Sequence, residues 1–225
     1  MPNRLPLFPL GSVLFPGLAM PLRVFEDRYR ELVEDLLALP ADEPRAFGVL
    51  GIELGHEVGE LSADQLSAVG CVVEITDVQR DEEGGFDLVV TGTGRFQVRE
   101  LLPPDSAHAY LRAVTDPLPD EVGAGADELC ERAIRLFSLY CERLNGIGVV
   151  AEPPEEFPAK ALQVSYSVSG AMIVDQSDKQ ALLEAEHAAA RLELVCDLLR
   201  RENRVLSSLR LLPAGRFLRH EVNLN

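Results

Sequence analysis

The sequence predicts an α+β fold in which a β-rich half is followed by a helical half. Up to about residue 116, short runs alternate apolar and polar side chains, the period-2 pattern of strands. From about residue 128, apolar side chains recur at the 3.6-residue spacing of helices. Between them lies DPLPDEVGAGADE, which is rich in Pro, Gly and Asp. We therefore predict a β unit over residues 1–116 and a helical unit over residues 117–225, with a connector at about residues 116–127.

The β half is predicted to contain extended runs interrupted by one helix. The helix covers Glu26–Leu39, where apolar residues share one face and Pro40 ends the pattern. The segment Asp81–Gly85, DEEGG, predicts a hairpin loop because Gly supplies the positive φ that such loops need. The expected extended runs are Leu5–Leu10, Ser12–Leu14, Met20–Val24, Ala46–Glu53, Val69–Gln79, Phe86–Gly92, Arg95–Leu101 and Ala109–Thr115.

The helical half is predicted to contain four helices. Ser177 and Gln180 fit a capping box, with Ser at the N-cap and Gln three residues on. The connector, with its Pro, Gly and Asp residues, is expected to be the first site of limited proteolysis. The expected helices are Glu128–Leu144, Ala159–Met172, Ser177 to about Ala185, and Glu186–Leu209.

Composition excludes several classes of protein. The chain has 225 residues, with 21 Lys and Arg against 37 Asp and Glu, a formal net charge of −16. Nucleic acid is therefore an unfavoured partner, since phosphate binding depends on clustered cations. None of the cysteines forms a CxxC pair, which excludes zinc ribbons and thioredoxin-type motifs and favours a reducing cytoplasm. The cysteines are Cys71, Cys130, Cys141 and Cys196.

The uncharged stretch near the N-terminus is the one candidate for a membrane segment. It runs from Leu5 to Leu22 and has the length of a membrane span. It contains Pro6, Pro9, Pro16 and Pro21, and Pro removes backbone donors and breaks helices. We therefore predict strand and turn here, and no interaction with a membrane.

Two long segments resemble a known family. They are LPLFPLGSVLFPGLAMPLRVFEDRYRELVEDLL (Leu5–Leu37) and VGCVVEITDVQRDEEGGFDLVVTGTGRFQV (Val69–Val98), the second with Gly92 and Arg95 near the end of its strand. Both are similar to the Lon protease N-terminal, substrate-binding domain, and most similar to stand-alone proteins built only of that domain. The similarity continues more weakly through LEAEHAAARLELVCDLLRRENRVL. The resemblance implies a PUA-like β pseudo-barrel with one inserted helix, then a C-terminal helical bundle. It also implies recognition of unfolded or degron-bearing polypeptides.

The catalytic motifs of full-length Lon are not found in these residues. A P-loop needs a Gly-Lys-Ser/Thr step so that the backbone and lysine hold phosphates. The lysines here are Lys160, which follows Ala159, and Lys179, which follows Asp178. Neither has a glycine-flanked serine near it that could act as the nucleophile of a Ser–Lys pair. The sequence therefore predicts a non-enzymatic protein without catalytic residues or cofactors.

Other motifs are better explained as structural elements than as functional sites. The string TGTGRF, Thr91–Phe96, lacks the third glycine of a dinucleotide fingerprint and leads into a strand-like run, so we predict a bend between strands. The four histidines have no metal-ligand spacing, and no metal site is predicted. Paired acids in so acidic a chain are expected to be solvated.

The start of the first helix is the predicted peptide-binding site. A domain that recognises unfolded chains needs accessible apolar surface with a polar rim. In the resemblance, Asp27 and Arg28 align with an acidic–basic pair of the protease, whereas Arg23 and Phe25 depart from its pattern. The sequence leaves open whether the apolar members of the site are exposed or in the core. The predicted site residues are Phe15, Met20, Phe25, Asp27, Arg28 and Tyr29.

Two functional hypotheses follow. The first is a polypeptide-binding module, a quality-control adaptor whose partners are client polypeptides and a protease or chaperone. The second is a PUA-like regulator that binds a small molecule or RNA. Arg200, Arg201 and Arg204 could form a basic patch for RNA, or a solvated helix face paired with the acidic β half. An exposed apolar groove favours the first hypothesis, and an electropositive groove the second.

Overall fold

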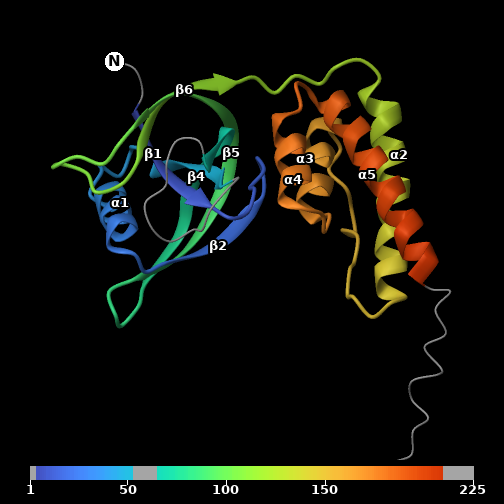
Figure 1. Cartoon of the computed structure of the whole chain (residues 1–225), viewed down its shortest axis with the longest axis horizontal. Helices are drawn as coiled ribbons and strands as arrows, with labels where there is room; N and C mark the ends of the chain where they lie inside the picture. The colour runs from blue at the N-terminus through green and yellow to red at the C-terminus, as the bar shows by residue number, and fades with distance from the viewer. Residues whose placement is uncertain (1–3, 53–64, 210–225) are drawn as a thin grey trace, which may run out of the picture.

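The computed structural model of this chain describes residues 4–52 and 65–209. The strands within these residues are β1 Arg4–Leu10, β2 Ala19–Val24, β3 Ala46–Ile52, β4 Leu66–Arg80, β5 Phe86–Leu102 and β6 Arg112–Leu118. The helices are α1 Asp27–Leu37, α2 Ala126–Asn145, α3 Ala161–Ala171, α4 Gln176–Glu184 and α5 Ala188–Leu209. The α+β class is confirmed, with a β unit, one inserted helix and a helical unit (Figure 1). The run predicted over Ala46–Glu53 corresponds to β3, and its last residue, Glu53, lies outside the described residues.

The strands close into a barrel with one strand added outside the ring. The sheet order is β2-β5-β4-β3-β1-β6, and a further pairing of β5 with β6 joins its two sides. Only β1 and β3 run parallel among the described pairs. The outer strand, β2, pairs along its whole length with the first part of β5, from Ala19 opposite Thr91 to Val24 opposite Phe86. Within the described ranges, β2 therefore has one hydrogen-bonded edge and one edge with no partner strand.

A single long strand, β5, replaces the two strands that the sequence predicts around TGTGRF. The expected bend is a β-bulge: Val72 pairs with Gly94 and Val73 with Gly92, which leaves Thr93 without an opposite residue. A Cβ at Gly92 would lie 2.4 Å from the Phe15 carbonyl oxygen, so the strand can pass this point only with glycine. The string TGTGRF thus belongs to the barrel wall.

The helical unit packs in two layers. α3 and α4 lie next to the barrel, and α2 and α5 lie on the far side (Figure 1). Its core also includes Phe15 and Val69 from the β unit. The predicted capping box is wrong: Asp175 is the N-cap of α4 and makes no side-chain cap bond. The Gln180 side chain instead donates to the Val69 carbonyl of β4, at 3.0 Å, and to Glu184.

A buried arginine joins the two units. The Arg95 guanidinium of β5 donates to the carbonyls of Leu183 (2.8 Å) and Ala185 (2.7 Å) and forms an ion pair with Asp120 (3.4 Å). Asp120 also accepts from the Tyr166 hydroxyl, whose ring stacks under the guanidinium of Arg191 at 4.1 Å. Both arginines are buried. Since a buried cation must be hydrogen-bonded, this network fixes the helical unit against the barrel.

The connector is held by backbone hydrogen bonds. The first N–H groups of α5 donate to it, Ala188 to Glu121 O and Ala189 to Val122 O, both at 2.9 Å. The connector is otherwise exposed, and the expectation that protease cuts it first stays a prediction. Strands end at Leu118 and α2 begins at Ala126, and the division at residue 116 stays a prediction. No described helix has the length and apolar character needed to span a membrane.

Candidate functional site

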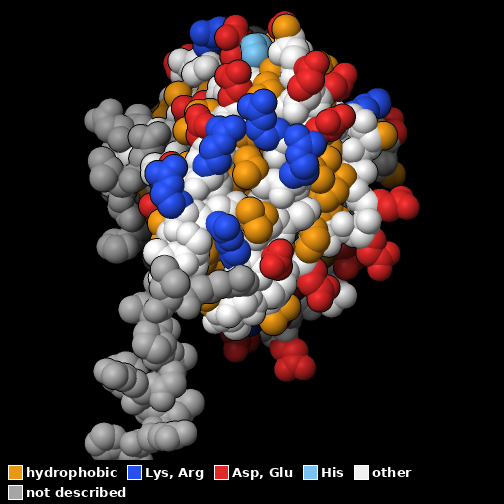
Figure 2. All heavy atoms as spheres, turned by 90° about the vertical axis from the view of Figure 1, so that its right-hand side faces the viewer, with side chains coloured by type: hydrophobic (Ala, Val, Ile, Leu, Met, Phe, Trp, Pro, Cys, Tyr) orange, Lys and Arg blue, Asp and Glu red, His pale blue; other side chains and the backbone are white. Residues whose placement is uncertain are grey.

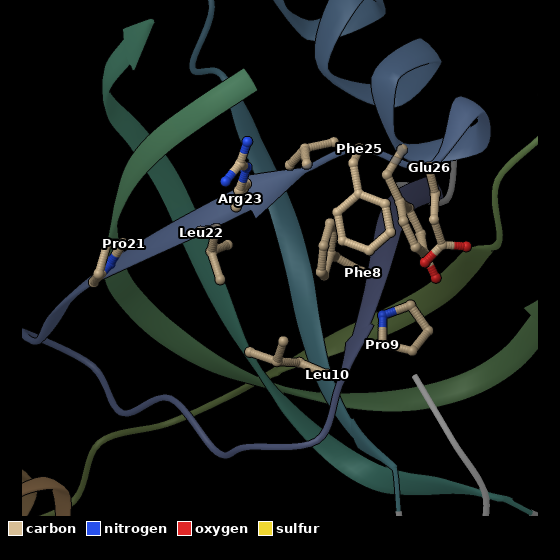
Figure 3. A pocket seen from close by; sticks show the side chains of 10 residues that line it. Phe8, Pro9, Leu10, Pro21, Leu22, Arg23, Phe25 and Glu26 are labelled. Atoms are coloured by element: carbon tan, nitrogen blue, oxygen red, sulfur yellow. The ribbon is translucent and has the colours of Figure 1, made fainter. Parts of the chain in front are cut away.

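An apolar groove opens between β1 and β2 beside the start of α1. Its volume is about 230 Å³, and Figure 3 shows the side chains around it. The floor is formed by Phe8 and Leu22, both buried, and the mouth by Phe25 and Glu26. The lining residues are Phe8, Pro9, Leu10, Pro21, Leu22, Arg23, Val24, Phe25, Glu26 and Tyr29. The groove is thus apolar inside with a charged rim, as binding sites for apolar side chains usually are.

Two strand edges border this groove, and neither has a partner strand in the part of the chain that the structure describes. The first part of β1 pairs with β6, but from Phe8 to Leu10 β1 pairs only with β3 among the described residues. The N–H of Leu7 donates to Leu111 O on the side away from β3, at 2.8 Å. Because backbone groups alternate along a strand, the nitrogen of Pro9 faces that same side. Pro9 has no N–H, so this edge offers no backbone hydrogen-bond donor at this position. A ligand would meet side chains there instead.

The β2 edge follows the same rule. The carbonyl of Leu18 accepts from Gly92 N of β5, at 2.9 Å, so Pro21, three residues on, directs its nitrogen away from β5. Pro is tolerated in a sheet only where its missing donor is not needed, such as an open edge. The two prolines therefore favour open strand edges on both sides of the groove, and at these positions a ligand meets side chains rather than backbone N–H groups.

Phe25 is the exposed apolar side chain of the groove. It follows directly after β2 and is 64% exposed. Figure 3 shows its ring at the mouth, beside Phe8 and Glu26. Among the described residues it is the one aromatic side chain that is largely exposed to solvent. A partner that covered it would gain on the order of 1–2 kcal/mol from this side chain alone.

The structure separates the predicted site residues into two groups. Phe25 and Tyr29 line the groove, and Tyr29 packs on Phe8 with ring centroids 4.3 Å apart. Beside them, Arg28 forms an ion pair with Glu26 (2.8 Å) and stacks over Tyr29 (4.6 Å). Asp27 is exposed at the start of α1. Tyr29 is itself buried in the barrel core, so the accessible members of this group are Phe25 and Asp27, with Arg28 half-buried.

The other two predicted residues face the interior. Phe15 is fully buried in the helical core, 6.3 Å from Tyr166 between ring centroids. Met20 is half-buried against the barrel core. Phe15 as a peptide contact is therefore replaced by groove residues that sequence reasoning missed, above all Phe8, Pro9 and Leu22. The period-2 pattern of β2 could have indicated Leu22, but the contribution of β1 depends on the closure of the barrel.

Acidic side chains surround a second hollow next to the groove. It lies between α1 and the hairpin after β4, and Asp81 links it to the groove through an ion pair with Arg23 (4.0 Å). Arg30 and Arg80 are already paired, with Asp27 and Glu34. The acidic members of this hollow are Asp27, Glu31, Glu34, Asp81 and Glu82. The surroundings of the groove are thus not electropositive.

Lys179 does not form a Ser–Lys pair of the kind found in a peptidase active site. The Lys179 ammonium donates to the carbonyls of Ser169 and Gly170 at the end of α3, at 2.5 and 2.7 Å, and not to a serine hydroxyl. Burial lowers the pKa of Lys179 from its ordinary 10.5 to about 8. Through these two bonds the lysine caps the carbonyls at the C-terminus of α3, at a site where burial disfavours its charge. No cluster of His, Cys, Asp or Glu suited to a metal ion occurs in the described part of the chain.

Comparison with known proteins places this barrel and helical bundle in a family. Residues 4–201 match the ATP-dependent protease La (LON) substrate-binding domain. The chain is 30% identical over 217 residues to Lon protease 2 of Myxococcus xanthus and to Lon protease of Anaeromyxobacter dehalogenans. Each alignment covers 92% of this chain and 24% of the relative, so the chain spans about a quarter of their length.

Solved structures show the same fold. The Lon N-terminal domain protein from Xanthomonas campestris matches 88% of this chain and 98% of its own, with a TM-score of 0.58 and 25% identity. The N-terminal domain of Mycobacterium avium complex Lon protease matches the same shares with a TM-score of 0.64 and 18% identity. The fold is therefore that of the N-terminal domains of Lon proteases. The chain belongs to the LON substrate-binding domain family.

Proposed function

We propose that this protein binds unfolded or degron-bearing polypeptides through the groove at Phe25, without catalysing a reaction itself. The observation that carries the proposal is an exposed Phe at the mouth of an apolar groove with a charged rim. Membership of a substrate-binding family agrees with this role. In this proposal the protein is a cytoplasmic quality-control adaptor that presents clients to a protease or chaperone.

The size of the groove limits the affinity. A peptide that buries 300–400 Å² of apolar surface gains roughly 8–10 kcal/mol. Ordering a flexible chain costs several kcal/mol of this gain, so we expect dissociation constants in the micromolar range or weaker. Such binding is suited to many clients rather than one, because apolar burial is not directional.

Substitution of Phe25 tests the proposal. In the Phe25→Ser variant, we expect affinity for a reduced, unfolded peptide to fall about tenfold, which corresponds to the loss of the 1–2 kcal/mol of one buried side chain. The melting temperature should hardly change, because the side chain is already exposed. Fluorescence anisotropy with the labelled peptide and a thermal melt of each variant measure the two effects.

Val150→Ser is the matched control, since Val150 is 87% exposed and does not line the groove. It should bind peptide as the wild type does. A large fall in the melting temperature of Phe25→Ser would mean that this residue supports the fold. Absence of binding below millimolar peptide would refute the polypeptide-binding function.

The competing hypothesis of an RNA site has no support at this groove. Its neighbourhood is acidic, and phosphate would be repelled there. The absence of enzymatic activity is part of the proposal and has its own test. Purified protein should release no phosphate from ATP and no fragments from casein, and a turnover abolished by a point mutation in this chain would contradict it.

A further inference from the structure

A second surface, on the far side of the molecule, carries clustered arginines. It lies along α2 and α5, the two helices most distant from the barrel (Figure 1). Figure 2 looks onto this side and shows Lys and Arg side chains gathered around hydrophobic ones, although the protein has a formal charge of −16. The residues of this arginine groove are Arg132, Leu136, Leu139 and Arg143 of α2, and Arg200 and Arg204 of α5.

Helix spacing brings these residues together. The α2 members follow one another at intervals of four, three and four residues, and the α5 members at four, so each set forms a stripe. The two helices run parallel, since Cys196 Sγ contacts Leu129 O (3.9 Å) and Asn203 Nδ2 donates to Leu136 O (3.1 Å). The Arg143 guanidinium donates to Asn203 O across the same line. The stripes therefore flank one groove between the helices.

The positive charge of this groove is only partly compensated. Arg200 pairs with Asp197 on its own helix (2.5 Å). Arg132 and Arg204 are exposed and form no ion pair with any described residue. Arg201 points to the other side of α5 and pairs with Asp178 of α4 (2.7 Å), so it lies outside the groove. Thus the basic residues are not paired with the acidic β half within the described chain.

The centre of the groove is apolar. Leu139 is 36% exposed, and Leu136 is partly buried against the helical core. The aromatic residues of α2, Phe137 and Tyr140, are buried, and α5 has none. Sites for single-stranded nucleic acid normally combine cations with exposed aromatic rings that stack on bases. This groove combines cations with leucine instead.

We propose that the arginine groove binds an acidic amphipathic helix of a partner protein. Apolar residues of such a helix would cover Leu136 and Leu139, and its carboxylates would accept from the arginines on either side. A third helix laid along a parallel pair also suits the form of the surface, because helices pack through ridges and grooves. The surface is separate from the Phe25 groove, so partner and client could bind at the same time.

The probe is a synthetic amphipathic peptide of about 14 residues whose leucine stripe is bordered by Glu on both sides. A peptide with Lys in place of each Glu is its control. Binding is measured on the whole protein by anisotropy, at low salt and again at about 0.5 M salt, where exposed charges are strongly screened. A labelled single-stranded oligouridylate is titrated in parallel.

We expect the acidic peptide to bind and high salt to weaken its binding; any binding of the Lys peptide, at the acidic surroundings of the Phe25 groove, should not depend on Arg200 and Arg204. In Arg200→Glu/Arg204→Glu, affinity should fall at least about tenfold, since the reversed charges repel the peptide. Arg80→Glu/Arg99→Glu makes the same change of net charge on the barrel and should bind normally. If the first variant fails to fold, Arg200→Gln/Arg204→Gln gives the same test with a smaller expected loss.

Failure to bind the acidic peptide, or equal binding by the variant, overturns the proposal. Oligouridylate binding as tight as peptide binding, and lost in the same variant, overturns it in favour of a nucleic-acid surface. Phe25→Ser should leave binding of the acidic peptide unchanged, because Phe25 lies outside the arginine groove. Failure of this proposal can therefore be distinguished from failure of the proposed client binding.

Discussion

At the scale of single residues, burial gives two cations unusual surroundings. Arg95 and Lys179 both donate to carbonyls between elements rather than to solvent. Neither role could be predicted from the sequence, where Arg95 forms part of a glycine-rich string and Lys179 part of an apparent helix cap. The carbonyls that Arg95 contacts are far away in sequence, 88 positions for Leu183, and those that Lys179 contacts belong to the preceding helix.

Lys179 should make stability depend on pH in the alkaline range. Its pKa in the folded protein is about 8, below the ordinary 10.5, so the unfolded chain binds more protons between these values. Stability contributed at this site therefore rises with pH from about 8 to 10.5 and is constant below. Urea unfolding of the wild type and Lys179→Met across this range should show the rise only in the wild type. Subtracting the two curves removes the shared titration of Tyr and Cys, and parallel curves would contradict the assignment.

At the scale of elements, β5 is the strand on which the barrel depends. It pairs with β2 and β4 in its first part and with β4 and β6 in its second. The sequence predicts most helices and strands to within a few residues, because alternation and the 3.6-residue period are local signals. It divides β5 in two because glycines usually interrupt strands, and the bulge that accommodates them depends on the partner strand.

Two glycines of β5 allow a matched test. Gly92→Ala should destabilise the protein by about 2–4 kcal/mol, because the new methyl would meet backbone of the Phe15 turn and the Cys71 sulfur. Gly94→Ala should be neutral or slightly stabilising, since nothing lies within 4 Å of its Cβ position. Thermal or urea unfolding of both variants measures the difference. Equal effects would show that the close approach at Gly92 does not constrain the strand.

At the scale of the whole molecule, the barrel and helical unit should unfold together. The Arg95 network and the shared core around Phe15 connect them. The sequence indicates two units but not the contacts between them. The periodicity of apolar residues shows which face of an element is buried, but not which other element it packs against. For the candidate groove, the sequence indicates Phe25 and the start of α1 but not the floor, which β1 supplies only after closure of the barrel; peptide binding at these residues stays a prediction.

Arg95→Met tests the contacts between the units. It removes donors to buried carbonyls and leaves Asp120 without its ion pair, so we expect a loss of about 3–5 kcal/mol. The melt should broaden or divide into two transitions, and protease should cut the connector near residues 119–125 faster than in the wild type, because its hydrogen bonds to the start of α5 are released. Arg99→Met, at an exposed ion pair on the same strand, is the control and should change little. A single sharp transition in Arg95→Met would show that apolar packing alone couples the units.

The two prolines beside the Phe25 groove also bear on aggregation. Unfolded segments that are rich in apolar residues are the ones that stack into cross-β fibrils, and an open strand edge is a template for that growth. Pro9 and Pro21 have no backbone N–H, so the strand edge on each side of the groove lacks a hydrogen-bond donor that an added strand would need. A protein that gathers such segments, as proposed here, would raise their local concentration without supplying a nucleus on which they could order.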